Sequence, residues 1–307
     1  MNLSYHQKNK GEITLKTYTI KNDLLTIAVN TFGAELCSIV KNETKKEYLW
    51  HGDPAFWGRR SPILFPIVGS LKNKEFIYEN KSYPMNQHGF ARDMEFSLLD
   101  QTDSSISFQL TSTPETLEKY PFEFELTISY ELVGTKLIVS WDVHNTNKTP
   151  MYFSIGGHPA FLCPIQEGEN RRDCSFEFNT KENQFEYKKV ITGGLLNTES
   201  NTMKLDHGCL AIGDHLFDED ALVIENKQAT KVSLLSKDHT PYLTMHFDAP
   251  LFGLWSPAKE NTPFVCIEPW YGRCDAYNFD GTLKDREYGN MLDADKTFHV
   301  SYEIEIH

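Results

Sequence analysis

Short stretches of strand-forming residues, separated by turn residues, recur along almost the whole sequence. In residues 136–145 the later positions alternate apolar and polar side chains, which is typical of a strand with one buried face. Asn and Asp stand between neighbouring stretches, as in Lys21-Asn22-Asp23, and predict hairpin turns. The predicted strands are residues 15–20, 24–29, 35–40, 75–78, 81–83, 96–99, 105–110, 122–132, 136–145, 221–225, 231–235, 242–247, 264–268 and 298–306. This pattern constrains the chain to antiparallel sheets.

Helical signals are scarce. Residues 114–119 predict a short helix with Thr113 as its N-cap, and residues 53–57 predict another turn. The sequence has no repeat of fixed period, no low-complexity segment and no linker rich in Pro, Gly or Ser. We therefore predict an all-β fold, with residues 1–307 forming one large β-sandwich domain rather than two domains.

The charge balance narrows the class of partner. The 43 acidic residues outnumber the 30 basic ones, and a net charge of -13 argues against nucleic acid and anionic membranes. The net charge does not exclude a ligand with a small phosphate group, because binding one needs only a few local arginines. Residues 1–12 lack the apolar stretch of a signal peptide, and no window approaches 18 apolar residues. We expect a soluble, cytoplasmic protein with no membrane partner.

The six cysteines show no C-x-x-C spacing, which argues against a zinc knuckle. In a cytoplasmic protein they are expected to be reduced thiols. Because the number of cysteines is even, disulfides are an alternative if the protein is not cytoplasmic.

One histidine is presented in an unusual local sequence, Gly156-Gly157-His158-Pro159. The glycines permit close approach by a ligand or another backbone, and the proline biases His158 away from a helix. An imidazole delivered rigidly at a strand end is able to give or take a proton near neutral pH. The alternative is a buried histidine that hydrogen-bonds to backbone, and this segment alone does not decide between the two.

Three further polar clusters interrupt the strand pattern. The first is the pair Arg59-Arg60, which could equally be a solvated surface pair. The second is the loop 86–93, where amide, imidazole and guanidinium groups suit a hydroxyl-rich or anionic ligand, or form an ordinary polar loop. The third is Glu268, which ends an apolar strand. Partial burial there would raise its pKa and suit a general base, and the alternative is a buried salt bridge to an arginine.

Together these clusters resemble a known family. The segments Gln87-His88-Gly89-Phe90-Ala91-Arg92, 156–161 and 266–270 resemble the three signatures of the aldose 1-epimerase (galactose mutarotase-like) family. The resemblance is greatest to its LacX-type branch, near the glucose-6-phosphate 1-epimerases, and spans residues 14–306. It implies a β-supersandwich fold and interconversion of the α and β anomers of an aldohexose or its phosphate.

The resemblance also implies roles for individual residues. Glu268 would be the general base, His158 the general acid, and His88 a second histidine near the sugar ring oxygen. The implied ligand-binding positions are Gln87, Arg92, one arginine of the pair Arg59 and Arg60, and one aspartate of Asp218 and Asp220, with Asp220 preferred. The Gly-Arg-x-x-Asn-Arg pattern of true galactose mutarotases is absent, and residues 65–70 stand in its place, which argues against plain galactose as substrate.

The residue types fit this chemistry without the resemblance. Mutarotation needs one group to remove the anomeric hydroxyl proton and one to protonate the ring oxygen, and requires no metal or nucleotide cofactor. We expect Glu268 to be ionised and His158 protonated, with Glu268 controlling the acid limb of the pH profile and His158 the alkaline limb.

A carbohydrate-binding module without catalysis remains an alternative. The eleven histidines are too scattered for a metal-dependent cupin.

Overall fold

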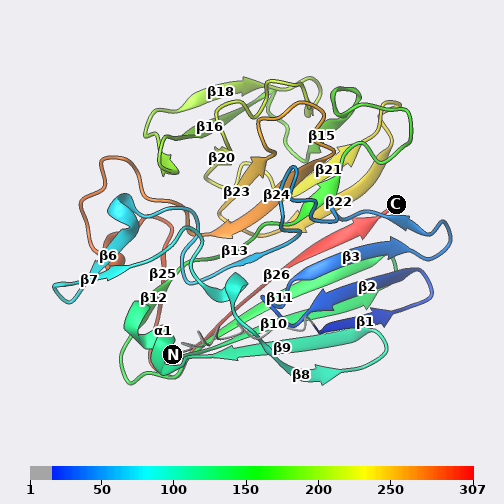
Figure 1. Ribbon diagram of the computed structural model, residues 1–307. Coiled ribbons are helices and arrows are strands. Elements are labelled where there is room, and N and C mark those ends of the chain that lie inside the picture. The colour runs from blue at the N-terminus through cyan, green and yellow to red at the C-terminus, as the bar shows by residue number, and fades with distance from the viewer. Residues whose placement is uncertain (1–15) are drawn as a thin grey trace, which may run out of the picture.

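The computed structural model describes residues 16–307 and is built almost entirely from antiparallel strands (Figure 1). Leu15, the first residue of one predicted strand, and the polar segment 1–12 lie outside the described residues. The predicted all-β class is confirmed.

One sheet of nine strands crosses the molecule from β8 at the bottom of Figure 1 to β15 and β21 in the upper half. In sheet order its strands are β19 (Cys209–Ala211), β15 (Ser175–Phe178), β21 (Lys231–Leu235), β22 (Pro241–Phe247), β26 (Thr297–Ile306), β11 (Lys136–Asn145), β10 (Phe124–Val133), β9 (Ser105–Thr111) and β8 (Ser97–Gln101). Strands β10 and β11 alternate buried and exposed residues as the sequence predicts, because one face of this sheet covers the core.

A second sheet of nine strands carries the candidate site. Its strands are β17 (Leu195–Leu196), β16 (Gln184–Ile191), β20 (Leu222–Ile224), β23 (Leu251–Trp255), β24 (Phe264–Tyr271), β13 (Ile155–Gly157) and β5 (Ile63–Leu64), with β14 (Ala160–Leu162) beside β24 and β18 (Asn201–Lys204) beside β16. Strand β24 is buried along all but its last residue. Burial on both faces explains why its sequence is continuously apolar rather than alternating.

Three smaller sheets complete the fold. They are β1 (Thr17–Lys21), β2 (Leu25–Asn30), β3 (Leu36–Lys41) and β4 (Lys46–Glu47); β6 (Glu75–Tyr78) and β7 (Lys81–Pro84); and β12 (Met151–Phe153) and β25 (Asn290–Leu292). The four-stranded sheet packs on the first large sheet: the rings of Tyr18 and Phe108 lie 5.9 Å apart, and the Tyr130 hydroxyl donates to the Ala34 carbonyl at 2.6 Å.

Helices contribute little to the described part of the chain. The predicted helix forms as α1 (Pro114–Lys119), and Thr113 caps it by accepting the Thr116 amide hydrogen. Short 3-10 turns are η1 (Lys72–Lys74), η2 (Ala91–Asp93), η3 (Arg171–Asp173) and η4 (Leu283–Asp285). Among residues 16–307, no helix is long and apolar enough to span a bilayer.

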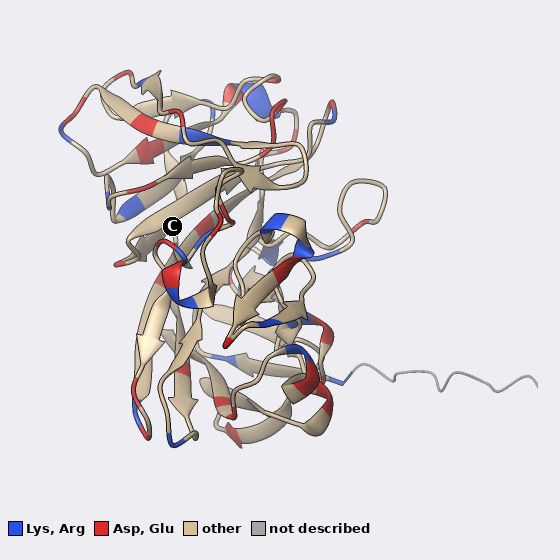
Figure 2. Cartoon of the chain, turned by 90° about the vertical axis from the view of Figure 1, so that its left-hand side faces the viewer, with Lys and Arg blue, Asp and Glu red and all other residues tan. Residues whose placement is uncertain are grey.

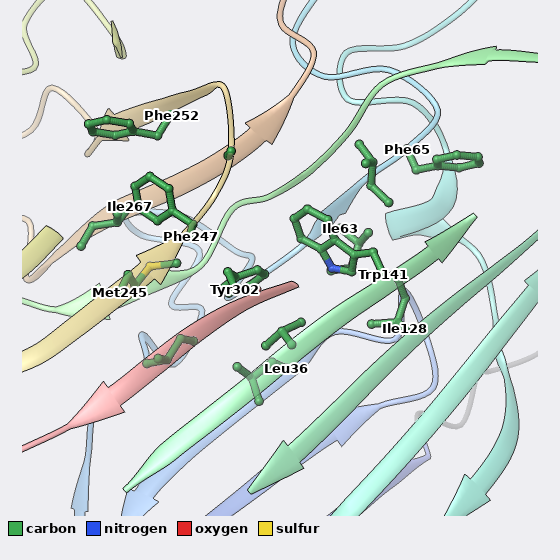
Figure 3. Close-up of a cluster of buried hydrophobic side chains, with 14 of the residues drawn as sticks. Leu36, Ile63, Phe65, Ile128, Trp141, Met245, Phe247, Phe252, Ile267 and Tyr302 are labelled. Atoms are coloured by element: carbon green, nitrogen blue, oxygen red, sulfur yellow. The ribbon is translucent and has the colours of Figure 1, made fainter. Parts of the chain in front are cut away.

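The core lies between the sheets (Figure 3). Trp141 of β11 and Tyr302 of β26 meet edge to face at 5.3 Å, and Phe247 of β22 lies 5.2 Å from Phe252 of β23, which joins the two large sheets. Charged residues of both signs are scattered over the strands and loops in Figure 2. All six cysteines lie in the described part of the chain, and there they are free thiols.

Several strands were not predicted. Strand β23 (Leu251–Trp255) was missed because its sequence, Leu-Phe-Gly-Leu-Trp, is short, apolar and contains a glycine. The strands β15 to β19 were also missed, although Ser-Phe-Glu-Phe in β15 and Gln-Phe-Glu-Tyr in β16 alternate polar and apolar residues. The missed strand β23 matters for function, since Trp255 at its end belongs to the candidate site.

Candidate active site

Strand pairing places His158 and Glu268 opposite each other. Gly156 pairs with Trp270 before the histidine, and Ala160 pairs with Cys266 after it. The same register puts His158 opposite Glu268, on one face of the sheet. Their side chains meet there, with His158 Nε2 3.3 Å from Glu268 Oε2. Only 10% of the imidazole and 1% of the carboxylate are exposed, so water screens this contact weakly.

The two glycines before His158 are required by the rings around them. A Cβ on Gly156 would lie 2.6 Å from Cδ1 of Trp270, and one on Gly157 would lie 3.1 Å from the Trp141 ring. The glycines therefore allow the indole rings to pack directly against the backbone that presents His158.

Two tryptophans hold the imidazole in place. The Trp57 ring stacks on His158 with centroids 4.7 Å apart, and the Trp255 ring meets it edge to face at 5.3 Å. These rings restrict the orientation of the imidazole and exclude water from one side of it. Sequence reasoning missed Trp255 as a site residue, and it recorded Trp57 only as a neighbour of the arginine pair.

His88 stands at the same site, with its ring centroid 5.7 Å from that of His158. The Gly69 amide donates to His88 Nδ1 at 3.1 Å, so in the neutral ring the proton lies on Nε2. Burial and the positive charges of Arg92 and Arg59, with His158 beside it, hold the pKa of His88 well below its usual value. His88 is thus a neutral hydrogen-bond donor.

The segment that orients His88 is anchored by a buried ion pair. Asp275 accepts from Arg286 Nε at 2.8 Å and from the Lys72 amide at 3.0 Å, and its own amide donates to the Ser70 carbonyl. These contacts hold the backbone that supplies the Gly69 amide. No sequence motif identified this network, because Ser70 and Lys72 lie about 200 residues before Asp275 in the sequence.

Burial shifts the pKa values of the pair in opposite directions. It raises the pKa of Glu268 well above its usual value, with help from the charge of Asp220. Burial, together with the positive charges of Arg92 and Arg59, lowers the pKa of His158 to about 3. These directions favour a proton on Glu268 and a neutral His158. They are opposite to the expected state, in which Glu268 is ionised and His158 is protonated.

These groups line a pocket of about 300 Å³ that opens to solvent. Six of the predicted residues contribute to its wall: Gln87, His88, Arg92, His158, Asp220 and Glu268. A larger cavity of about 660 Å³ lies elsewhere, beside Arg171 and Lys259, and of the candidate site residues only Asp218, the less favoured aspartate, lines it. The chemistry therefore points to the smaller pocket.

The arginines of the first cluster differ in position. Arg59 forms an ion pair with Asp93 at 2.8 Å, and its charge lowers the pKa values of both histidines, so it stands near the pocket without lining it. Arg60 directs its Nε to the His51 carbonyl at 2.8 Å and does not line the pocket either. Arg59 is thus the better placed of the two for a ligand.

Arg92 lies in the pocket wall. Its Nη2 donates to the Gln87 carbonyl at 2.8 Å, while Nε is buried without a hydrogen-bond partner among the described residues. Burial and the nearby charge of Arg59 lower its pKa to about 10. The guanidinium remains charged at neutral pH and has a donor available for a ligand.

The open choice between two aspartates is also resolved by position. Asp220 lines the pocket, has a left-handed backbone with φ of 73°, and accepts the Ala221 amide hydrogen at 2.9 Å. Asp218 instead binds His215 Nδ1 at 2.7 Å, outside this pocket. Asp220 is the aspartate that a ligand in the pocket would meet.

A family model described as aldose 1-epimerase matches residues 16–283. The chain belongs to the aldose 1-epimerase family. The chromosomal LacX protein of Lactococcus lactis subsp. lactis is 36% identical over 299 residues, which cover 94% of this chain and 99% of that protein.

Solved structures of the family agree in fold. A galactose mutarotase related enzyme from Lactobacillus acidophilus is 34% identical with a TM-score of 0.89, covering 95% of this chain and 97% of that one. A galactose mutarotase-like protein from Lactobacillus casei is 29% identical with a TM-score of 0.86, covering 95% and 100%. Membership of this family implies that a small sugar is the ligand class.

Proposed function

We propose that this chain is an aldose 1-epimerase, which interconverts the α and β anomers of an aldohexose or its phosphate. The observation that carries the proposal is the contact of His158 Nε2 with Glu268 Oε2 at 3.3 Å, in the wall of a pocket of about 300 Å³. That pocket is of a size for one small molecule.

Ring opening requires that one proton be removed from the sugar and one proton be added to it. As the ring opens, the base removes the proton of the anomeric hydroxyl, the C1–O5 bond breaks, and the acid protonates O5. Rotation about C1–C2 and closure on the other face of C1 return both protons. The pair therefore carries a single proton at every stage, and only its location changes.

The buried pair is suited to this exchange. Burial favours the state with the proton on Glu268, which corresponds to the stage at which the sugar is open. A closed sugar needs the other state, with Glu268 ionised and His158 protonated, and hydrogen bonds from the bound sugar would stabilise it. Because the two atoms are in contact, passing between these states moves a proton by a short distance and changes no net charge.

Neighbouring groups would bind and orient the ring. His88, protonated on Nε2, would donate to the ring oxygen or the open-chain carbonyl. Asp220 and Gln87 would bind hydroxyl groups, and the indole rings of the pocket would cover the apolar face of the sugar. Arg92, with Arg59 behind it, would bind a phosphate on a phosphorylated sugar.

The test is anomer exchange followed by NMR, and by polarimetry on freshly dissolved α-glucose, α-galactose and their 6-phosphates, with no added cofactor. We expect interconversion faster than in buffer for at least one of these sugars, and a rate lower by about 10²–10⁴-fold from His158→Asn at the same concentration. If no sugar is accelerated while calorimetry detects its binding, the protein is a carbohydrate-binding protein of this fold and not an epimerase.

A further inference from the structure

A thiol lies beside the proton-exchanging pair and takes no part in the proposed reaction. Cys266 is two residues before Glu268 on β24, so both side chains point to the same face of the sheet. Its cross-strand partner is Ala160, whose small side chain leaves room for the sulfur atom. Cys266 is fully buried under the pocket.

The three side chains form a compact set of metal-binding atoms. One ligand atom each from His158, Cys266 and Glu268 lies within 4.8 Å of the others, and within residues 16–307 this is the one such group found. Nitrogen and oxygen ligands at about 2.0–2.1 Å from a tetrahedral ion lie about 3.3–3.4 Å apart. The separation of His158 Nε2 and Glu268 Oε2, 3.3 Å, matches that edge.

A second observation points to a ligand at this place. Glu268 Oε2 is buried, and apart from its 3.3 Å contact with His158 Nε2 it has no hydrogen-bond partner among the described residues. Buried polar atoms are normally satisfied, so a bound species that supplies the missing contact is favoured there. The pocket lined by His158 and Glu268 opens to solvent and gives an ion a route to them.

We propose that His158, Cys266 and Glu268 form a binding site for a thiophilic divalent cation of the Zn²⁺ or Cd²⁺ class. The set of one sulfur, one nitrogen and one oxygen donor suits these ions and disfavours Mg²⁺, which prefers oxygen ligands. As the ion binds, the Cys266 thiol proton and the proton shared by the pair leave to solvent. The fourth position faces the pocket and is left to water.

Occupation of this site would inhibit the protein. The ion takes the atoms that exchange protons with the sugar, so metal and sugar would compete. This consequence rests on the proposed epimerase function, whereas binding of the ion does not.

The binding test uses the full chain without sugar. Cd²⁺ is titrated while the ultraviolet thiolate-to-cadmium charge-transfer absorption is recorded, and Zn²⁺ affinity is measured by calorimetry. We expect one ion per chain, no comparable binding of Mg²⁺, and affinity reduced more than about 100-fold in Cys266→Ala, beyond the typical loss when an outer-shell partner is removed. His158→Asn should weaken binding similarly.

The matched control is Cys274→Ala, because Cys274 is a buried thiol that lines the same pocket but lies outside the triad. It should keep the cadmium absorption. If Cys266→Ala fails to fold by circular dichroism, Cys266→Ser keeps the volume and removes the soft donor. No absorption in the wild type, or absorption that survives loss of Cys266, overturns the site.

A separate arm distinguishes inhibition from the proposed function. If the wild type accelerates anomer exchange, Zn²⁺ should inhibit it, and Cys266→Ala should resist Zn²⁺ by the same factor as its affinity falls. Inhibition that is equal in both proteins overturns the inhibitory role. If no exchange is seen in any sugar, the proposed function fails, and the cadmium titration still decides the metal site.

Discussion

In the proposed reaction His158 and Glu268 carry one proton between them, and this determines how activity should depend on pH. A second proton added to His158, whose pKa is lowered to about 3, disables the pair at acid pH. Loss of the proton from Glu268, whose pKa is raised, disables it at alkaline pH. We predict that kcat/KM is constant between these limits, with His158 controlling the acid limb and Glu268 the alkaline limb. This order is the reverse of the one expected from the sequence.

The two limbs are separated by substitution. The residual activity of Glu268→Gln should lose the alkaline limb, because an amide does not ionise, and that of His158→Asn should lose the acid limb. A Glu268→Gln profile that keeps its alkaline limb and loses its acid limb would restore the original order.

Substitution of the proton-exchanging residues should lower turnover strongly. A positioned acid or base contributes about 10²–10⁴-fold, so Glu268→Gln and His158→Asn should each reduce kcat by that order. Since both residues act in one step, the double variant should lose much less than the product of the two single losses. Steady-state exchange rates measure all three, and multiplicative losses would show that the residues act independently.

Thermal unfolding supplies the folding control for Glu268→Gln. Because the pKa of Glu268 is raised in the folded protein, its contribution is fully present below the unfolded pKa and is lost as pH rises through the folded value. Glutamine stays neutral throughout. The variant should therefore be at least as stable as the wild type, with the largest gain at alkaline pH.

Arg92 should distinguish phosphorylated from free sugars. Its guanidinium is largely buried in the pocket wall, and its Nε, 3.8 Å from Asp93 Oδ2, has no hydrogen-bond partner among the described residues. A charge-assisted hydrogen bond is worth about 1.5–3 kcal/mol, so Arg92→Ala should reduce phosphosugar use about ten- to a hundredfold more than free-sugar use. The control Arg60→Ala, whose Nε binds the His51 carbonyl, should affect both substrates equally. Equal losses in Arg92→Ala would assign Arg92 to the ring or to structure.

At the scale of elements, strand β13 must pass very close to Trp270. A Cβ at Gly156 would lie 2.6 Å from the indole, so Gly156→Ala should force the strand or the ring to move. Overpacking of this kind typically costs about 1–3 kcal/mol. Because His158 follows two residues later, kcat should also fall.

Gly213→Ala is the matched control for this substitution, since no atom lies within 4 Å of a Cβ built there. Urea unfolding and exchange rates should leave it near the wild type. A Gly156→Ala protein of unchanged stability and rate would mean that β13 has more room than its packing indicates.

At the scale of the whole molecule, the largest cluster of buried side chains reaches both large sheets. One cluster of buried side chains includes Ile27 of β2, Trp141 of β11, Phe252 of β23 and Ile304 of β26. We therefore predict that the chain unfolds as one domain, in a single cooperative transition. Tryptophan fluorescence and far-ultraviolet circular dichroism should give coincident urea curves, and two separated transitions would contradict the single-domain prediction.

The sequence by itself determined the class of fold and the residue types of the site. Alternation in residues 136–145 and the turn residues between strands depend on local geometry, which neighbouring residues encode. The same is true of helix α1, whose Thr113 cap lies three residues from its partner. The Gly-Gly-His-Pro segment and the acid that follows the apolar residues 264–267 also marked His158 and Glu268 without any structure.

Only the tertiary structure decided how those residues act. His158 lies opposite Glu268 because of the register between two strands more than 100 residues apart in the sequence. The folded chain also places Trp255 and Asp220, but not Asp218, in the pocket wall. The directions in which the pKa values of Glu268 and His158 shift also depend on the tertiary structure. The sequence shows that a carboxylate and an imidazole are present, but burial, which determines the cost of charging them, exists only after the sheets have packed.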